Sequence, residues 1–340
     1  SIIDLGSAYT RSGFAGDDMP RATMVTACGH ARAKSQLENK LYFADDLENK
    51  RSQFKIGFPI EHGRVTNWDD LQSLLRYTYS QELHVDSSEC VAFLTEQPRC
   101  PRDARAKMCQ LLIEKFQVKG FYSGLAQQLA IYASGETTGC IVDVGEGQTS
   151  IVPIFEGVQL AHAVRQGDFS GKELTNELFK KIREFDASFQ QDQWILRDIK
   201  RQINIFDGYL QYELPDGQKM RQIQLKNADE VPKLLFEGEK SVQLLIQKSI
   251  LSCDQDLQKF LSQNICLSGG STCFGGFEDK MNEELQRIGE GWKIQALEDR
   301  ENATFMGCSI LASLDQFKEF YVTSQEVQEH GADVISMKWL

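Results

Sequence analysis

The feature that most constrains this chain is a motif that occurs twice, far apart in the sequence. The first copy is IIDLGSAYTRSGFAG at residues 2–16, and the second is IVDVGEGQTSIVPIFEG at residues 141–157. Each copy has two apolar residues, then Asp, one further residue and Gly, and a Thr follows six positions after the Asp. Such a pattern is typical of a strand, a tight turn and a second strand. The repeat therefore predicts a duplicated fold, with one copy in each of two lobes and the two turns facing each other.

The rest of the chain mixes strand-length apolar runs with helical periodicity. Apolar runs end in Asp or Gly at residues 140–145 and 265–270. Leu174, Leu178 and Ile182 share one helix face, and Asn67 is placed to cap another helix. Strands mixed with helices of this length indicate α/β sheets. A chain of 340 residues with 41% apolar residues and no low-complexity linker is predicted to form two packed lobes joined by short crossovers.

Net charge limits the kinds of partner that we expect, and cysteine content indicates the compartment. The net charge of −12 disfavours a grip on nucleic-acid phosphates and favours basic protein surfaces. Nine cysteines without a CxxC pair indicate reduced thiols in a reducing compartment. No apolar run approaches the roughly 20 residues that span a membrane. We therefore expect protein partners, no nucleic acid, no membrane and a cytoplasmic location. Because the sequence opens inside an apolar strand, we expect its true start to precede residue 1.

The turns of the two copies are suited to holding a polyphosphate. A tight turn of small residues points several backbone N–H groups into one concavity, and that concavity binds anions. The two expected phosphate loops are Gly6, Ser7 and Ala8 on one side and Gly145, Glu146 and Gly147 on the other. Asp4 and Asp143, which end the preceding strands, are expected to hold Mg²⁺ through its waters. Arg11 is expected to reach a phosphate.

A third element favours a nucleotide site over two ordinary hairpins. The segment Ser268-Gly269-Gly270-Ser271-Thr272 follows an apolar strand and precedes an amphipathic helix. A strand, a Gly-Gly turn and a helix bring backbone close to a nucleotide. A lone Asp-x-Gly hairpin is usually only a hairpin, but the three elements together predict a split nucleotide cleft. They resemble the superfamily of actin, heat-shock-70 proteins and sugar kinases.

Within that superfamily, short segments resemble actin in family order across nearly the whole chain. These segments are residues 12–18, 59–63, 66–70, 94–96, 132–135, 137–139, 152–154, 156–157, 197–200, 214–217, 268–270 and 309–314. The chain is identified as a member of the actin family, and as a divergent actin-related protein. The stretches 269–277 and 309–319 are slightly more similar to the dynactin-type actin-related protein.

This resemblance implies a U-shaped fold of four subdomains with ATP or ADP and Mg²⁺ (or Ca²⁺) in a central cleft. Residues 1–133 with 303–340 would form the small lobe, subdomains 1 and 2. Residues 134–302 would form the large lobe, subdomains 3 and 4. Arg11 stands where the family has its phosphate-binding Lys. The positions that match the wall around ribose and adenine are Gly171, Arg197, Lys200, Gly269, Gly270, Ser271 and Phe274.

The chain departs from the family where actin does its chemistry. Ala126 and Ser150 stand where the family positions the attacking water with a Gln and a His. A group of this kind contributes roughly 10²–10⁴-fold to a rate. We therefore expect very weak or absent ATP hydrolysis. The alternative is that Gln127, which helix geometry turns away by about 100°, shifts inward as a substitute.

The nucleotide and filament contacts of the family are altered as well. Arg201 replaces a ribose-binding Glu and Glu301 replaces a Lys beside the adenine, so the two can exchange charge and keep an ion pair. The loop between Gly29 and Leu41, which matches the loop that grips the next subunit, is short and carries Lys34, Glu38 and Lys40. Segments 205–212 and 236–249 are also shortened, or lack residues. Ordinary long filaments are therefore not expected, although the fold tolerates shortened loops.

Three functions are compatible with these observations. The first is a structural subunit that holds ATP without turnover and docks, with actin or other actin-related subunits, in a cytoskeletal or motor-associated complex. Tyr132 and the tail 337–340 would bind partner helices, unless the tail is merely a packed terminus. The second is a filament-forming actin-like ATPase. The third is a sugar or acetate kinase, which the actin-like segments disfavour. Cytoplasm and cytoskeleton are expected, with nucleus or cilium as alternatives.

Overall fold

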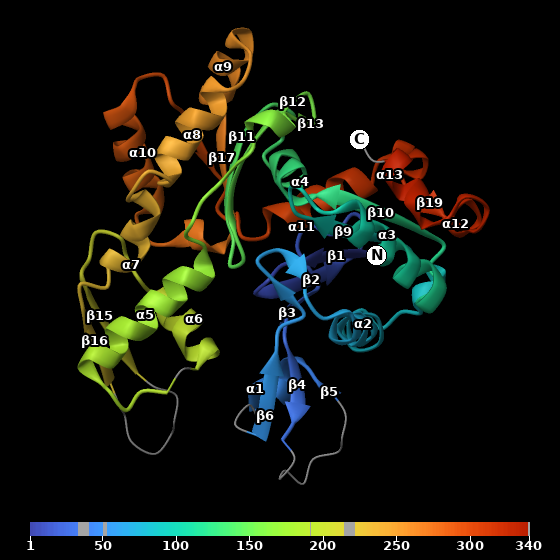
Figure 1. Ribbon diagram of the computed structural model, residues 1–340, viewed down its shortest axis with the longest axis horizontal. Coiled ribbons are helices and arrows are strands. Elements are labelled where there is room, and N and C mark those ends of the chain that lie inside the picture. The colour runs from blue at the N-terminus through green and yellow to red at the C-terminus, as the bar shows by residue number, and fades with distance from the viewer. Residues whose placement is uncertain (33–40, 50–52, 191, 214–221, 339–340) are drawn as a thin grey trace. The chain divides into compact units, whose positions relative to one another are not determined.

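The computed structural model describes residues 1–32, 41–49, 53–190, 192–213 and 222–338, and it shows a mixed α/β fold (Figure 1). The chain divides into two compact units. Unit 1 comprises Ser1–Thr137 and Asn302–Leu340, and unit 2 comprises Thr138–Glu301. The α/β fold class predicted from the sequence is confirmed. The further division into four subdomains stays a prediction.

Unit 1 is built on a six-stranded sheet in the order β19-β10-β9-β1-β2-β3. Its strands are β1 (Ile2–Leu5), β2 (Tyr9–Gly13), β3 (Ala22–Val25), β9 (Val91–Glu96), β10 (Gly120–Leu125) and β19 (Val322–Thr323). β1 pairs antiparallel with β2 and parallel with β9. β1 is therefore a central strand with hydrogen-bonded neighbours on both sides, and all four of its residues are buried.

Two smaller sheets complete the strands of unit 1. β4 (Cys28–Ala31) lies between β5 (Leu41–Tyr42) and β6 (Phe54–Gly57), and β7 (Ile60–Glu61) pairs with β8 (Arg64–Val65). The helices are α1 (Ala44–Asn49), α2 (Trp68–Tyr77), α3 (Arg102–Gln110), α4 (Ala126–Ala133), α11 (Ala303–Ala312), α12 (Ser324–His330) and α13 (Ile335–Lys338). α2 and α3 continue into π-helical turns at Thr78–Glu82 and Leu111–Lys115.

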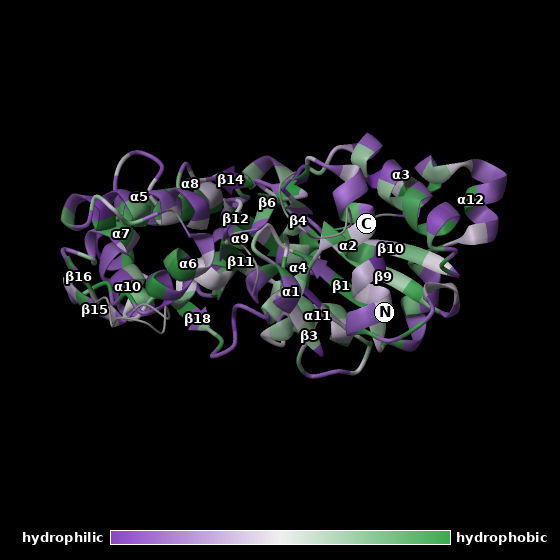
Figure 2. Cartoon of the chain, turned by 90° about the horizontal axis from the view of Figure 1, so that it is seen from below, coloured by the Kyte–Doolittle hydropathy of each residue, from purple (hydrophilic) through white to green (hydrophobic). Residues whose placement is uncertain are grey.

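Local sequence explains where the helices of unit 1 begin and how they pack. The Asn67 side chain accepts hydrogen bonds from the N–H groups of Asp69 and Asp70, both at 3.1 Å, and so caps α2 as predicted. Gly307 lets α11 cross α4 closely, because a Cβ there would lie 1.7 Å from the Leu129 carbonyl oxygen. Strands β9 and β10 are rich in hydrophobic residues, whereas α12 is mostly hydrophilic (Figure 2).

Unit 2 is built on a second sheet in the order β13-β12-β11-β17-β18, with β14 paired to β12. Its strands are β11 (Gly139–Val144), β12 (Thr149–Phe155), β13 (Val158–Gln159), β14 (Arg165–Gln166), β17 (Ile265–Ser268) and β18 (Ile294–Ala296), and a separate hairpin joins β15 (Tyr209–Glu213) to β16 (Gln222–Lys226). Helices are α5 (Gly171–Phe185), α6 (Gln193–Arg201), α7 (Glu230–Lys233), α8 (Val242–Leu251), α9 (Gln255–Ser262) and α10 (Phe277–Ile288).

The core of unit 2 contains the helix face predicted from the sequence. Leu174, Leu178 and Ile182 of α5 are completely buried and pack in one cluster with Val142 and Val144 of β11. α5 and α6 lie side by side, and the β15–β16 hairpin contacts α5 (Figure 1). α5 begins with a capping box, in which the Ser170 N–H donates to the Glu173 carboxylate at 2.8 Å.

Some predicted features lie outside the described residues. These are Lys34, Glu38 and Lys40 of the proposed subunit-gripping loop, the segment 214–217, and residues 339–340 of the tail. In the part of the chain that the structure describes, no helix is long and apolar enough to cross a membrane.

Candidate functional site

The two copies of the sequence repeat form matching hairpins, one in each unit. In unit 1 the β1–β2 hairpin is closed by a hydrogen bond from the Gly6 N–H to the Tyr9 carbonyl oxygen, at 3.1 Å. In unit 2 the β11–β12 hairpin has the same bond, from the Gly145 N–H to the Gln148 carbonyl, at 3.0 Å. Both first strands also pair parallel with a further strand, β9 or β17. The predicted strand–turn–strand duplication is confirmed.

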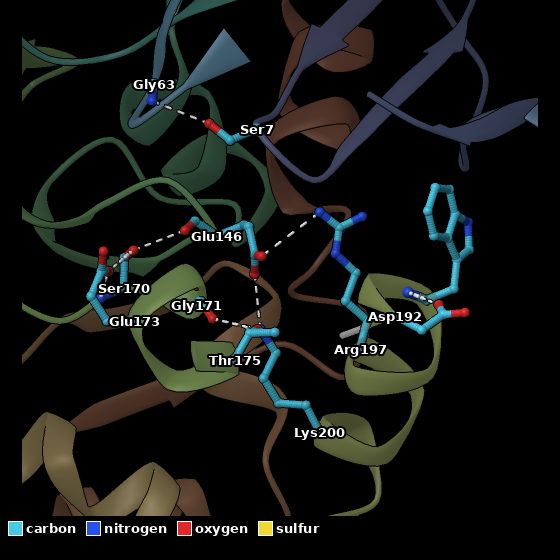
Figure 3. Close-up of polar contacts among 11 residues, drawn as sticks. Ser7, Gly63, Glu146, Ser170, Gly171, Glu173, Thr175, Asp192, Arg197 and Lys200 are labelled. Carbon is cyan, nitrogen blue, oxygen red and sulfur yellow. Dashed lines mark hydrogen bonds and ion pairs between the residues drawn. The ribbon is translucent and has the colours of Figure 1, made fainter. Parts of the chain in front are cut away.

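The first loop is held by contacts within unit 1. The Ser7 hydroxyl accepts a hydrogen bond from the Gly63 N–H at 3.1 Å, in the turn between β7 and β8 (Figure 3). The Ala8 carbonyl accepts from the Thr26 N–H at 2.9 Å. The loop is thus fixed on both of its sides by backbone groups from other segments. The sequence offered no signal for the contact with Gly63.

Asp4 ends β1 next to this loop and is almost completely buried. One of its oxygens accepts a hydrogen bond from the Thr95 hydroxyl at 2.8 Å, and the other lies 3.8 Å from a terminal nitrogen of Arg11. Burial raises the pKa of the Asp4 carboxyl, while Arg11 and Thr95 oppose the shift. Arg11 also donates through Nε to the Asn302 side-chain oxygen at 2.7 Å. The sequence did not predict this contact, because Asn302 lies far from Arg11 along the chain.

The second loop carries a buried charged cluster in unit 2 (Figure 3). The Lys200 ammonium donates to the Glu146 carboxylate at 2.8 Å, to the Gly171 carbonyl oxygen at 2.9 Å and to the Thr175 hydroxyl at 2.8 Å. The Arg197 guanidinium lies 3.7 Å from the other oxygen of Glu146. Lys200 and Arg197 come from one face of α6, and Thr175 from the first turns of α5. The structure therefore brings together four residues that the sequence predicted separately, and it adds Thr175.

The pKa shifts of Glu146 and Lys200 follow from burial and from the charged groups around each of them. Burial alone would raise the pKa of the Glu146 carboxyl, but Lys200 and Arg197 together outweigh it and lower that pKa. Burial also lowers the pKa of the Lys200 ammonium, which Glu146 opposes. The two directions differ because three cations, Lys200, Arg197 and Lys172, act on Glu146, whereas Lys200 faces one carboxylate and the further cations Arg197 and Arg201. The carboxylate is thus the better stabilised partner of the pair.

Backbone contacts fasten the second loop to the start of α5. The Gly171 N–H donates to the Gly145 carbonyl at 2.8 Å, and the Lys172 N–H donates to the Glu146 carbonyl at 2.9 Å. The Ser170 hydroxyl donates to that same Glu146 carbonyl at 2.8 Å. A Cβ on Gly171 would lie 2.5 Å from a carboxylate oxygen of Glu146 and 2.9 Å from its Cα, so a larger residue would displace the loop.

The Gly-Gly turn packs against the end of β11. Gly269 has a φ of +86°, and a Cβ there would lie 2.6 Å from the Asp143 carboxylate and from the Val144 carbonyl. Gly269 is therefore required by both backbone conformation and space. By contrast, a Cβ on Gly270 would meet no atom within 4 Å. The turn continues as a short 3-10 helix, Gly270–Cys273, and Phe274 behind it belongs to the hydrophobic core of unit 2.

The two positions at which the sequence predicts that water-positioning groups are lost, Ala126 and Ser150, lie one in each unit. Ala126 is the first residue of α4 in unit 1. Ser150 lies in β12 of unit 2, directly across from Asp143 on β11. Gln127 is completely buried, and its amide nitrogen donates to the Gln97 side-chain oxygen at 3.0 Å. The Gln127 amide is therefore already engaged within unit 1.

The proposed charge exchange between Arg201 and Glu301 is confirmed as an ion pair in unit 2, at 3.2 Å. The Arg201 side chain is 57% exposed and the Glu301 side chain 36%, so solvent screens the attraction. Among the described residues no group of three or more His, Cys, Asp or Glu is arranged to hold a metal ion directly. A divalent cation would have to be held by fewer protein ligands, together with phosphate oxygens and water.

Comparison with known protein families identifies the family to which this chain belongs. The family model of actin matches residues 1–204 and 200–339, which together span nearly the whole chain. The chain belongs to the actin family. Members of this family generally bind ATP or ADP with a divalent cation.

Proposed function

We propose that this protein is an actin-related structural subunit that binds ATP or ADP with Mg²⁺ (or Ca²⁺), hydrolyses ATP little or not at all, and docks in a larger cytoskeletal or motor-associated assembly. The observation that carries the proposal is the pair of matching hairpins, in a chain that has Ala126 and Ser150 at the two expected water-positioning sites. Tight turns of small residues such as these can point backbone N–H groups at an anion, which supports phosphate binding. The two side chains that would activate water are replaced.

In this proposal the phosphate-binding residues are Gly6, Ser7, Ala8 and Arg11 of the first repeat and Gly145, Glu146 and Gly147 of the second. Gly171, Arg197, Lys200, Gly269, Gly270, Ser271 and Phe274 would shape the surroundings of the ribose and adenine. The open backbone at Gly270 supports close approach of a ligand. Asp4 and Asp143 would hold the cation through its waters.

Slow hydrolysis is supported by the surroundings of the two replaced positions. Neither an alanine nor a short serine hydroxyl reproduces an amide and an imidazole that align water. Gln127 is the nearest candidate substitute, yet its amide is buried against Gln97. Bound ATP would then act as a lasting ligand that stabilises the folded chain by mass action.

Docking is supported by apolar groups on α11 and the residues after it. Ile310 near the end of α11 and Leu314 just after the helix are about half exposed, at 48% and 49%. Tyr132 of α4 packs against the neighbouring core cluster of unit 1. We propose that actin, other actin-related subunits or a multiprotein complex bind here, in the cytoplasm or cytoskeleton, with the nucleus or cilium as alternatives. A dynactin-type subfamily is part of this proposal.

The nucleotide content of the purified protein tests the proposal. We expect denaturation of protein purified without added nucleotide to release about one ATP per chain. That ATP should remain unhydrolysed after long incubation with Mg²⁺. Mostly ADP would instead favour the filament-forming ATPase. A protein that holds no nucleotide and gains none on incubation would contradict the proposal.

A further inference from the structure

The Lys200 side chain of α6 contacts two other segments of unit 2, the second loop and the start of α5. Its ammonium contacts the second phosphate loop through Glu146, the first residue of α5 through the Gly171 carbonyl, and the next turn of α5 through Thr175 (Figure 3). The three distances lie between 2.8 and 2.9 Å, which is ordinary hydrogen-bond length. The Lys200 side chain is 10% exposed and the Glu146 side chain 13%.

A lysine ammonium has three N–H donors and no acceptor. All three donors of Lys200 are used by Glu146, Gly171 and Thr175. A contact with a nucleotide oxygen would therefore need one of these bonds to break. Breaking the bond to Glu146 would take from a buried carboxylate its hydrogen-bonded cation and leave it the more distant Arg197 guanidinium, at 3.7 Å, and the charge of Lys172. That exchange is unfavourable, because a buried charge that loses its partner is costly.

We propose that Lys200 is a positioning residue rather than a nucleotide ligand, and that it fastens the Gly145–Gly147 loop to the N-terminus of α5 through Glu146. This inference rests on the proposed function for its link to nucleotide binding, but the fastening itself is made by protein groups. The loop carbonyls then accept hydrogen bonds from the Gly171 and Lys172 N–H groups as a consequence of that placement. Protein contacts thus hold the loop in one conformation, and such ordering reduces the cost of binding a nucleotide.

Hydrogen exchange in the nucleotide-free protein tests the fastening directly. In Lys200→Met, the amides of Gly171 and Lys172 should exchange roughly ten- to a hundredfold faster, as expected for the loss of a hydrogen-bonded buried charge. Glu146→Gln keeps an acceptor but removes the charge, so it should give a smaller increase at the same two amides. If Lys200→Met does not fold, amide exchange in Glu146→Gln tests the fastening instead. Unchanged exchange in the variants that fold would overturn the inference.

Lys180→Met is the matched control. Lys180 lies on the same helix, α5, and pairs with Glu177 at 2.8 Å, but its side chain is 68% exposed. The same chemical change there should leave the exchange of Gly171 and Lys172 as in the unaltered protein. Faster exchange in this control as well would show that any loss of charge on α5 loosens the loop, and would overturn the specific role of Lys200.

Nucleotide affinity separates positioning from direct contact. Lys200→Met should weaken ATP, 2′-deoxy-ATP and 3′-deoxy-ATP by the same factor, roughly tenfold or more, because it acts through the loop. Adding Glu146→Gln should cost less than the sum of the two single changes, since it removes the carboxylate left without Lys200. A changed ratio between ATP and either deoxy analogue, with additive losses, would make Lys200 a ribose ligand. If the unaltered protein binds no nucleotide, the proposed function fails, while the exchange measurement still decides the fastening.

Discussion

At the scale of single residues, polar side chains that match a nucleotide site are engaged with one another. Arg11 donates a hydrogen bond to Asn302, and Ser7 accepts one from Gly63. The Lys200 ammonium donates to three protein acceptors. Each contact fixes a loop or a side chain at little entropic cost on binding, because the ordering is completed during folding. The residues closest to the expected phosphates are thus organised by a layer of supporting residues.

The two replaced water-positioning residues lead to a prediction about rate. Changing Ala126→Gln together with Ser150→His should raise ATP hydrolysis by roughly 10²–10⁴-fold, because it restores groups able to align the attacking water. Single-turnover release of phosphate from protein loaded with ATP is the measurement. Both positions are buried, so thermal unfolding must first show that the double variant is folded.

Gln127→Ala serves as the companion variant for that experiment. If residual hydrolysis of the otherwise unaltered protein fell tenfold or more in Gln127→Ala, Gln127 would be the substitute water-positioning group. The absence of a water-positioning side chain at Ala126 would then not account for a low rate of ATP hydrolysis. The contact between Gln127 and Gln97 argues for the opposite outcome.

At the scale of secondary-structure elements, the C-terminal helices of unit 1 are joined by one carboxylate. Glu326 accepts hydrogen bonds from the Thr323 N–H at 2.8 Å and the Thr323 hydroxyl at 3.0 Å, which caps α12. Its other oxygen lies 2.6 Å from the Lys338 ammonium of α13. The ion pair with Lys338 and the cap at Thr323 lower the pKa of Glu326 to about 2.

This lowered pKa predicts acid-sensitive docking of α12. Because the folded-state pKa of Glu326 lies below its ordinary value of 4.5, its contribution to stability is complete above that pH. The contribution is lost as the pH falls towards 2. Amide exchange in α12, followed from neutral pH downwards and corrected for the intrinsic rate, should show protection falling in this window. In Glu326→Gln the cap persists but the charge is gone, so a fall of the same size would refute the assignment.

At the scale of the whole molecule, each unit has its own sheet and its own core. The buried cluster around Val142 and Leu174 belongs to unit 2, while the clusters around Ile3 and Phe93 belong to unit 1. Each unit also carries one of the two matching hairpins. A ligand that binds only the folded chain stabilises it by mass action, whatever the chemistry that follows.

Nucleotide should therefore raise the thermal stability of the whole chain. ATP with Mg²⁺ at about 100 times its dissociation constant should add about 2.7 kcal/mol to the free energy of unfolding. The midpoint of thermal unfolding should rise by roughly 5 °C in consequence. Adenosine at the same concentration is the control, because it lacks the phosphates that the loops would bind. An equal shift with adenosine, or none with ATP, would speak against phosphate binding by these loops.

Much of this architecture could be predicted because its signals are local in the sequence. The repeat at residues 2–16 and 141–157 specifies two hairpins, since apolar runs, Asp and Gly at fixed spacing dictate strands and a tight turn. The face of Leu174, Leu178 and Ile182 and the cap at Asn67 follow from helix periodicity and from the four free N–H groups of a helix start. The actin-like segments, distributed over the whole chain, pointed to the family that the comparison then showed.

Only the tertiary structure decided which of those residues contact one another. Nothing local connects Arg11 with Asn302, or Glu146 with Lys200 and Thr175, because a side-chain contact depends on how distant elements pack. The same holds for Gly171 and Gly269, where atoms of Glu146 and of the end of β11 leave no space for a Cβ. The sequence by itself determined the elements, the repeat and the family. Packing determined that Lys200 has its three donors satisfied within unit 2, since hydrogen bonds are distributed only once the chain is folded.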